Sequence, residues 1–262
     1  MSLFRRLHES GCFVMPNPWD LGSARLLERL GFPALATTSS GFAWSLGRSD
    51  NHVTLDEALA HVRSIAQGVE VPVSADFEGG FAVDPEGVAR HVAAAAATGI
   101  AGLSIEDSTG DAERPLFEFS VAVERIRAAR RASASSGMLL TARSEGFVVG
   151  RPDLPETLRR LVAYAEAGAD CLYAPGLKTA EDIAAAVKVV APKPLNVLAG
   201  FAPLTVAQYA DLGVRRVSVG GSLAKAAYGG LLAAARQIAE EGRFDLMLGG
   251  VTGREISVLL KG

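Results

Sequence analysis

Eight short apolar runs recur along the chain, each bounded by glycine, proline, asparagine or aspartate. Runs that are rich in β-branched and apolar residues and closed by turn-forming residues are typical of strands. Apolar residues follow one another in these runs instead of alternating with polar ones, which predicts strands buried on both faces, as in a parallel sheet. The runs occupy residues 12–17, 33–39, 71–76, 102–107, 138–143, 171–176, 194–200 and 215–221.

Helical patterns lie between these runs. Thr54 and Asp56 are candidate caps at the start of one helix, and Gly99 and Gly168 close two others. Strands that alternate with helices favour a parallel sheet covered by helices. The clearest helical segments are residues 54–67, 85–99, 154–168 and 179–191.

Eight strand–helix units in 262 residues match the usual size of a (β/α)8 barrel of the TIM type. We therefore predict an α/β fold with one barrel domain over residues 1–262, which includes a C-terminal helical tail from about residue 222 to 262. An open doubly wound sheet is the alternative. It lacks support, because no G-x-G-x-x-G motif follows the first predicted strand.

Composition narrows the possible partners. The formal net charge is −3 and no run of lysine or arginine is present, so we expect no nucleic acid partner. No apolar run reaches the roughly 18 residues that a membrane span needs, and the N-terminus lacks the apolar core of a signal peptide. We expect a cytoplasmic protein with no membrane partner. Cys12 and Cys171 lack disulfide or metal spacing and are expected to pack as small apolar side chains.

Carboxylates gather at the ends of the predicted strands, where the active sites of barrels lie. Asp76 and Glu78 follow the third strand, and Glu106 ends the fourth, without a matching set of lysines. Oxygen ligands of this kind suit a hard dication, Mg2+ or alternatively Mn2+, with waters completing its coordination. A single carboxylate at such a position often only caps the following helix. Three in one barrel favour a metal site.

Arg143 ends the fifth predicted strand. Its planar guanidinium can hold a substrate carboxylate through two parallel hydrogen bonds. Alternatively, it pairs with Glu145 or with a barrel carboxylate. The first possibility predicts a divalent metal that faces an anion-binding arginine, with a small-molecule carboxylate as substrate.

Four segments together resemble the isocitrate lyase and phosphoenolpyruvate mutase superfamily. The likeness follows the chain in order from about residue 13 to 221. The superfamily shares D-x-D-x-G-[YF]-G, I-E-D and A-R-T-D strand ends and a Ser-Gly substrate loop. The matching segments are "TTSSGFAWSLGRSD" (37–50), "SADFEGGFA" (74–82), "GLSIEDS" (102–108) and "LTARSEGF" (140–147).

The resemblance implies roles for individual residues. Asp76 is similar to the direct Mg2+ ligand, whereas Glu78, Glu106 and Asp50 resemble carboxylates that hold the metal's waters. For the substrate, Ser40, Gly41 and Phe42 resemble the loop whose backbone amides bind a carboxylate, Arg143 the arginine on its other side, and Asn196 an asparagine at the seventh strand end. The resemblance also implies a homo-oligomer, a dimer or tetramer, in which the C-terminal helix can be exchanged between subunits.

Two departures from the superfamily patterns bear on the reaction. The lyases carry K-[KR]-C-G-H in a gating loop after the I-E-D strand, but residues 108–119 here read "STGDAERPLFEF". The mutases place an asparagine in this loop, and the corresponding position is Arg114. Isocitrate or methylisocitrate cleavage is therefore not expected, and nothing in this loop favours phosphonomutase chemistry.

The resemblance implies a core that can bind a 2-oxo acid, and this core predicts the chemistry. Loss of a β-carboxylate as CO2 needs no protein nucleophile, so we predict a Mg2+-dependent lyase that cleaves a C–C bond of a small 2-oxo or 2-hydroxy carboxylate through an enolate, as oxaloacetate decarboxylases do. Other cleavages need an acid-base group, for which His52 and Tyr173 are the candidates. The alternatives are P–C bond chemistry, as in phosphoenolpyruvate mutase and carboxyphosphonoenolpyruvate phosphonomutase, and a non-catalytic 2-oxo acid binder.

Overall fold

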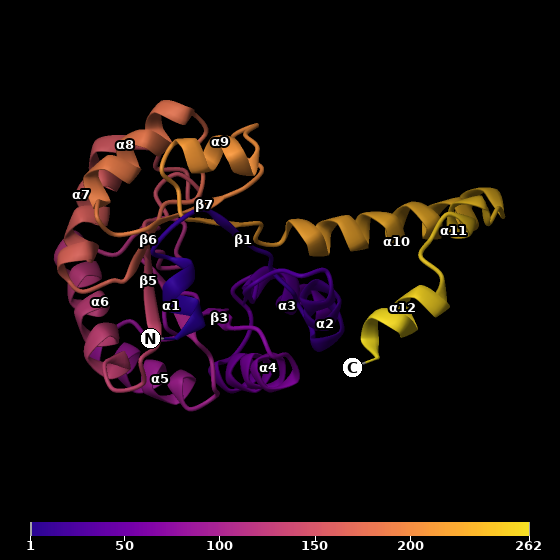
Figure 1. Cartoon of the computed structure of the whole chain (residues 1–262), viewed down its shortest axis with the longest axis horizontal. Coiled ribbons are helices and arrows are strands. Elements are labelled where there is room, and N and C mark those ends of the chain that lie inside the picture. The colour runs from indigo at the N-terminus through magenta and orange to yellow at the C-terminus, as the bar shows by residue number, and fades with distance from the viewer. Residues whose placement is uncertain (1, 262) are drawn as a thin grey trace.

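The computed structural model describes residues 2–261 and contains a barrel of eight parallel strands surrounded by helices (Figure 1). The strands are β1 (Phe13–Met15), β2 (Leu35–Ala36), β3 (Val73–Asp76), β4 (Gly102–Glu106), β5 (Leu139–Arg143), β6 (Cys171–Tyr173), β7 (Leu195–Leu198) and β8 (Arg216–Ser218). The helices are α1 (Leu3–Leu7), α2 (Leu21–Arg29), α3 (Ser39–Ser45), α4 (Leu55–Gly68), α5 (Pro85–Ala96), α6 (Phe119–Ser133), α7 (Leu154–Glu166), α8 (Ala180–Val190), α9 (Val206–Asp211), α10 (Ser222–Glu241), α11 (Asp245–Leu248) and α12 (Gly253–Leu260).

The strand order confirms the predicted barrel. Hydrogen-bonded neighbours run β1-β8-β7-β6-β5-β4-β3-β2, all parallel. The backbone N–H of Ala36 donates to the carbonyl of Pro16 at 3.0 Å, which joins β2 to the end of β1 and closes the ring. All eight strands lie inside the predicted apolar runs, so the carboxyl ends of the strands meet at one rim.

Local sequence signals fix the helix boundaries. Thr54 is the N-cap of α4 in a reciprocal pair with Glu57, as the predicted helix start requires, and Asp56 lies in the first turn of that helix. Asp84 caps α5 and is followed by a proline at the first helical position. These caps fix the residues at which α4 and α5 begin.

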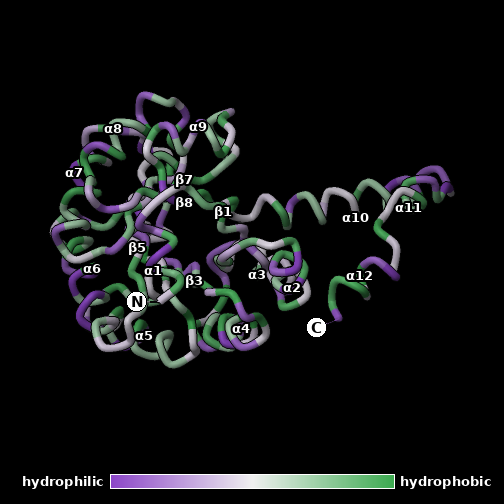
Figure 2. Tube along the Cα trace, viewed as in Figure 1, coloured by the Kyte–Doolittle hydropathy of each residue, from purple (hydrophilic) through white to green (hydrophobic). Residues whose placement is uncertain are grey.

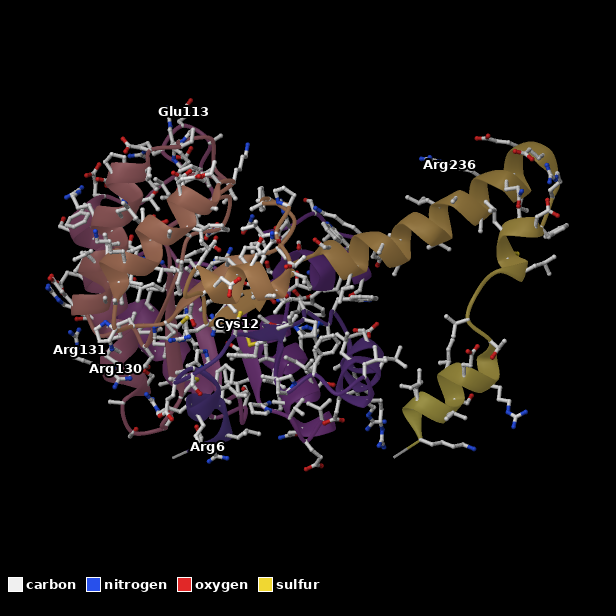
Figure 3. The ribbon with its side chains drawn as sticks, turned by 45° about the horizontal axis from the view of Figure 1, so that its top comes forward. Arg6, Cys12, Glu113, Arg130, Arg131 and Arg236 are labelled. Carbon is white, nitrogen blue, oxygen red and sulfur yellow. The ribbon has the colours of Figure 1, made fainter. Side chains whose placement is uncertain are left out.

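The tail after β8 leaves the barrel. Helix α10 projects from the ring, and α11 and α12 turn back so that α12 packs against α2 (Figure 1). Figure 2 shows hydrophobic stretches along this arm, and Figure 3 places Arg236 on its projecting part. Among residues 2–261, no helix has the length and apolarity to cross a lipid bilayer.

The end of the barrel opposite this rim is plugged by the N-terminal helix. Phe4 of α1 is buried against Phe13 and Leu139. His8, just after α1, is 8% exposed, and its Nδ1 lies 2.8 Å from the carbonyl oxygen of Phe4. Its Nε2 lies 3.1 Å from Nη1 of Arg216 and therefore accepts a hydrogen bond from it. Burial, followed by the positive charge of Arg216, lowers the pKa of His8 to about 3.

We expect this buried neutral histidine to make the protein less stable in mild acid. The unfolded chain takes up a proton on His8 below its ordinary pKa of about 6.5, while the folded protein does so only near the lowered pKa. Stability is therefore complete above pH 6.5 and falls with pH, by about 2 kcal/mol between pH 7 and 5. Urea unfolding should show that the free energy of unfolding differs less between pH 7 and pH 5 for His8→Gln than for the wild type.

The matched control is His52→Gln, which removes a histidine from the exposed surface. If His8→Gln leaves the difference between pH 7 and 5 unchanged, the assignment of acid sensitivity to His8 is wrong.

Candidate active site

Six of the predicted site residues line one cavity of about 160 Å3 at the carboxyl ends of the strands. This volume is smaller than the roughly 300–1,000 Å3 of pockets that take drug-sized ligands, and it suits a small anion. Residues that follow β2, end β3, β5 and β6, or lie within β7 converge here, as the barrel predicts. The six are Ser40, Asp50, Asp76, Arg143, Tyr173 and Asn196.

Arg143 lies at the centre of a group of carboxylates. Its Nη1 is 2.7 Å from Oδ1 of Asp76, its Nη2 is 3.3 Å from Oε2 of Glu106, and its Nε is 2.8 Å from Oε1 of Glu145. The structure thus shows the alternative in which Arg143 pairs with Glu145 and barrel carboxylates, and binding of a substrate carboxylate by Arg143 stays a prediction. A guanidinium carries five N–H donors, so these three contacts leave two N–H groups for another acceptor.

The charges of this group do not balance. Burial, together with the charges of Asp76 and Asp50, raises the pKa of Glu78 to about 8. Burial also raises the pKa of Glu106 well above its ordinary value, although Arg143 opposes this shift. Burial disfavours the Arg143 cation, but the facing carboxylates outweigh it and raise the arginine's pKa. The carboxyl groups outnumber the single arginine, so without a further cation Glu78 and Glu106 keep their protons at neutral pH.

This donor set fits a hard divalent cation. Asp76 lines both the main cavity and a smaller one beside it, which Glu78 also lines. Within residues 2–261, no group of three or more metal-ligating side chains is arranged to hold an ion by itself. One direct ligand, with neighbouring carboxylates that bind the ion's waters, is a normal arrangement for Mg2+, which gives up its waters reluctantly.

Glu78 lies in a strained turn after β3. Its φ of 46° and the φ of 54° at Phe81 are unusual for residues other than glycine. Arg125 of α6, which is 1% exposed, holds this turn by donating to the carbonyl oxygens of Gly79, Ala82 and Val83. The guanidinium of Arg125 fixes the turn that carries Glu78, a function that helical periodicity alone did not reveal.

The substrate loop predicted after β2 forms the first turn of α3. The N–H of Ser39 donates to Oδ2 of Asp76 at 3.0 Å, and Ser40 lines the cavity. Gly41 lies behind the cavity wall. An added Cβ there would stand 2.7 Å from Cγ2 of Thr38, so only glycine fits without displacing a neighbouring side chain. Phe42 lines the smaller cavity and stacks on His61 with ring centroids 3.7 Å apart.

Asn196 and Tyr173 form the opposite wall. Nδ2 of Asn196 donates to Oγ of Ser218 at 3.0 Å, and the hydroxyl of Tyr173 lies 3.5 Å from the same oxygen. The guanidinium of Arg143 lies over the Tyr173 ring, 5.0 Å from its centroid. Burial raises the pKa of Tyr173 to about 12.

Three predicted residues, Gly41, His52 and Glu106, line neither cavity. His52 is exposed, and its Nδ1 lies 2.8 Å from the backbone oxygen of Asp50 and 3.1 Å from Oγ of Ser49. Glu106 contacts the site through Arg143. Asp50 keeps much of its surface in solvent, yet partial burial of its carboxyl group and the nearby Asp76 raise its pKa.

A buried network supports the site from behind. Asp107 is 3% exposed and accepts hydrogen bonds from the hydroxyl of Tyr164 at 2.6 Å and from Nη1 of Arg160 at 3.1 Å. Its other oxygen accepts from the backbone N–H of Glu145 at 2.8 Å. Asp107 thereby fixes the chain directly after β5, which carries Arg143.

The segment after β4 forms a short hairpin over this rim. Ser108 and Leu116 pair in an antiparallel bridge, and the N–H of Thr109 donates to the carbonyl of Pro115 at 3.0 Å. The Arg114 side chain is exposed, and Figure 3 shows Glu113 at the outer edge of the molecule. These contacts give the segment its own local structure without a catalytic side chain of the lyase type.

Comparison with known proteins places the chain among enzymes. A crystal structure of a candidate lyase/mutase from Burkholderia cenocepacia J2315 has a TM-score of 0.95 and 46% identity, covering 99% of this chain and 95% of that one. Oxaloacetate decarboxylase of Rhodopseudomonas palustris (strain BisB5) is 28% identical over 220 residues, 81% of this chain and 74% of the relative. A structure of phosphonopyruvate hydrolase with oxalate and Mg2+ has a TM-score of 0.85 and 29% identity, covering 98% and 93% of the two chains.

The family model of phosphoenolpyruvate phosphomutase matches residues 4–239, which include every strand of the barrel and all the predicted site residues. The four sequence segments that resemble the superfamily indicate the same family. The chain belongs to the phosphoenolpyruvate phosphomutase family, within the isocitrate lyase and phosphoenolpyruvate mutase superfamily.

Proposed function

We propose that the protein is a Mg2+-dependent carbon–carbon lyase that decarboxylates a small 2-oxo diacid related to oxaloacetate. The observation that carries this proposal is the cavity in which Asp76 contacts Arg143, beside the further carboxyl groups of Glu78, Glu106 and Asp50. The likeness to oxaloacetate decarboxylase supports the choice of reaction, and the oxalate and Mg2+ bound to phosphonopyruvate hydrolase support the choice of ligands.

Each side chain of the cavity has a place in this reaction. Asp76 would hold Mg2+, with Glu78, Glu106 and Asp50 around its waters. Bound there, the ion would supply Lewis-acid polarisation of a 2-oxo group. Ser40 and the two remaining N–H groups of Arg143 would orient the substrate carboxylate, while Asn196 completes the wall.

The proton balance involves Tyr173. When the C–C bond breaks, its electron pair passes to the remaining 2-oxo acid as an enolate, CO2 leaves, and a proton must then be added to carbon. Tyr173 lines the cavity and its hydroxyl is protonated at neutral pH, so it can donate this proton and recover it from water, although its raised pKa makes it a weaker acid than an ordinary tyrosine. Exposed His52 is less well placed for this role.

The test is an assay of metal-stripped protein against oxaloacetate, 2-oxoglutarate, phosphonopyruvate and phosphoenolpyruvate, with Mg2+ then restored. CO2, pyruvate, glyoxylate and phosphate are followed. We expect Mg2+-dependent release of CO2 and pyruvate from oxaloacetate above the rate with Mg2+ alone. Release of phosphate, or interconversion of the two phosphorus compounds, would favour P–C bond chemistry instead. Binding without any turnover would indicate a 2-oxo acid binder.

We also propose that the protein forms a homo-oligomer through its C-terminal arm. Leu231, Leu248 and Val258 are 59%, 86% and 63% exposed, although they are apolar. A second copy that covers this arm would remove such surface from water. Exchange of the C-terminal helix remains a prediction, which light scattering of the full chain and of a chain ending at residue 241 would examine.

A further inference from the structure

Arg216 is a charged side chain buried inside the barrel that the proposed reaction does not use. It is 3% exposed, it begins β8, and it lines the floor of the main cavity. Its Nη2 donates to Oγ1 of Thr141 at 3.0 Å, and Thr141 lies two residues before Arg143 on β5. Arg216 therefore lies one layer of inward-facing side chains below the group around Arg143.

All the hydrogen-bond acceptors that the protein offers to this guanidinium are neutral. Besides Thr141, Nε donates to Oδ1 of Asn196 at 2.9 Å, and Nη1 donates to Nε2 of His8 at 3.1 Å. Within the described part of the chain, Arg216 forms no ion pair with a carboxylate. Asp170, whose charge acts on His8, is paired with Arg5 and Arg130.

A buried charge without a counterion is unfavourable, and proteins normally pair such a group. Arg143 in the layer above has three carboxylate partners, whereas Arg216 has none. Three of the five N–H groups of Arg216 are used, and two remain. The surrounding wall carries the hydroxyls of Ser74, Ser104 and Ser218, which can donate to an oxyanion.

We infer that Arg216 forms an anion subsite at the floor of the cavity, which takes a carboxylate or another small oxyanion. The inference rests on the proposed function where the anion is the second carboxylate of the substrate. In that case, Arg216 makes the site prefer 2-oxo diacids to 2-oxo monoacids. A free inorganic anion is the other source of the same chemistry.

The first arm of the test compares two 2-oxo acids that differ in their distal carboxylate. Titration calorimetry of the Mg2+-loaded protein with pyruvate and with 2-oxoglutarate gives both affinities for the wild type, Arg216→Met and Arg216→Lys. We expect Arg216→Met to weaken the binding of 2-oxoglutarate by about 10- to 100-fold and the binding of pyruvate by less than about 2-fold. Only the distal carboxylate of 2-oxoglutarate reaches the floor of the cavity. Arg216→Lys keeps the positive charge, so its affinity for 2-oxoglutarate should lie between those of the wild type and Arg216→Met.

The second arm uses inorganic phosphate and metal-stripped protein, so it does not depend on the proposed reaction. Phosphate should raise the melting temperature of the wild type and of Arg215→Met, but not of Arg216→Met. Arg215 is the matched control, because it is adjacent in sequence and its Nη1 binds the carbonyl of Gly11 at the surface. Circular dichroism checks that each variant folds. If Arg216→Met does not fold, Arg216→Lys replaces it in both measurements.

The outcomes separate the two claims. Equal weakening of both acids by Arg216→Met, with no phosphate effect that depends on Arg216, would overturn the subsite and assign Arg216 to the positioning of Asn196. If neither acid binds while phosphate stabilises through Arg216, the subsite stands with a free anion as its ligand and the proposed function fails.

Discussion

Replacement of Asp76 by asparagine is expected to abolish Mg2+-dependent turnover and to weaken metal binding by more than about 100-fold. Asp76 is the carboxylate shared by the two adjoining cavities, and one of its oxygens already accepts from the N–H of Ser39. Asparagine keeps the shape and can accept that bond, but it lacks the negative charge that a divalent ion requires. Mn2+ binding followed by electron paramagnetic resonance measures the loss directly and needs no substrate.

The matched control for this prediction is Asp56→Asn, which removes an exposed carboxylate from the first turn of α4. It should bind Mn2+ as the wild type does. Full metal-dependent turnover by Asp76→Asn would show that Asp76 is not the direct ligand. The metal would then have to be held by Glu78 or Glu106, the other predicted metal-binding carboxylates of the site.

The sequence predicted the barrel because buried parallel strands leave a simple pattern. Each apolar run ends at turn-forming residues, and these ends place Asp76, Glu106 and Arg143 on one rim whatever the exact length of each strand. The eighth apolar run also carries polar residues with a period of two. In "RRVSVGG" a period of two places Arg216 on the same face as Ser218, inside the barrel, and turns Arg215 outward.

Other features depend on contacts between distant segments and have no local signature. In the sequence, Arg125 resembles any other charged residue on an amphipathic helix. Only in the folded chain does its guanidinium reach the carbonyls around Gly79. His52 follows Asp50 by two residues, but the loop turns its ring to the surface. The projection of α10 likewise depends on where the helix leaves β8, and the sequence of the tail does not specify this.

The contacts of Arg143 make its replacement by methionine the most damaging change that we expect at this site. Without the guanidinium, Asp76, Glu106 and Glu145 lose their shared partner while they stay largely buried. Breaking one buried ion pair typically lowers the free energy of unfolding by about 3 to 5 kcal/mol, and we expect a loss of this size in metal-free protein. Turnover should fall by at least about 100-fold, because the substrate loses its anchoring cation.

Thermal unfolding with and without Mg2+ separates the two functions of Arg143. A divalent ion would neutralise part of the negative charge left unpaired in the variant, so Mg2+ should raise the melting temperature of Arg143→Met more than that of the wild type. Arg143→Lys should recover much of the stability but little of the turnover, since an ammonium cannot hold a carboxylate through two parallel bonds. Arg127→Met, which breaks a half-exposed pair with Glu124, is the control and should cost less than about 1 kcal/mol. A metal-free Arg143→Met protein as stable as the wild type would mean that the carboxylates take up protons and need no partner, and the case for a metal at Asp76 would weaken with it.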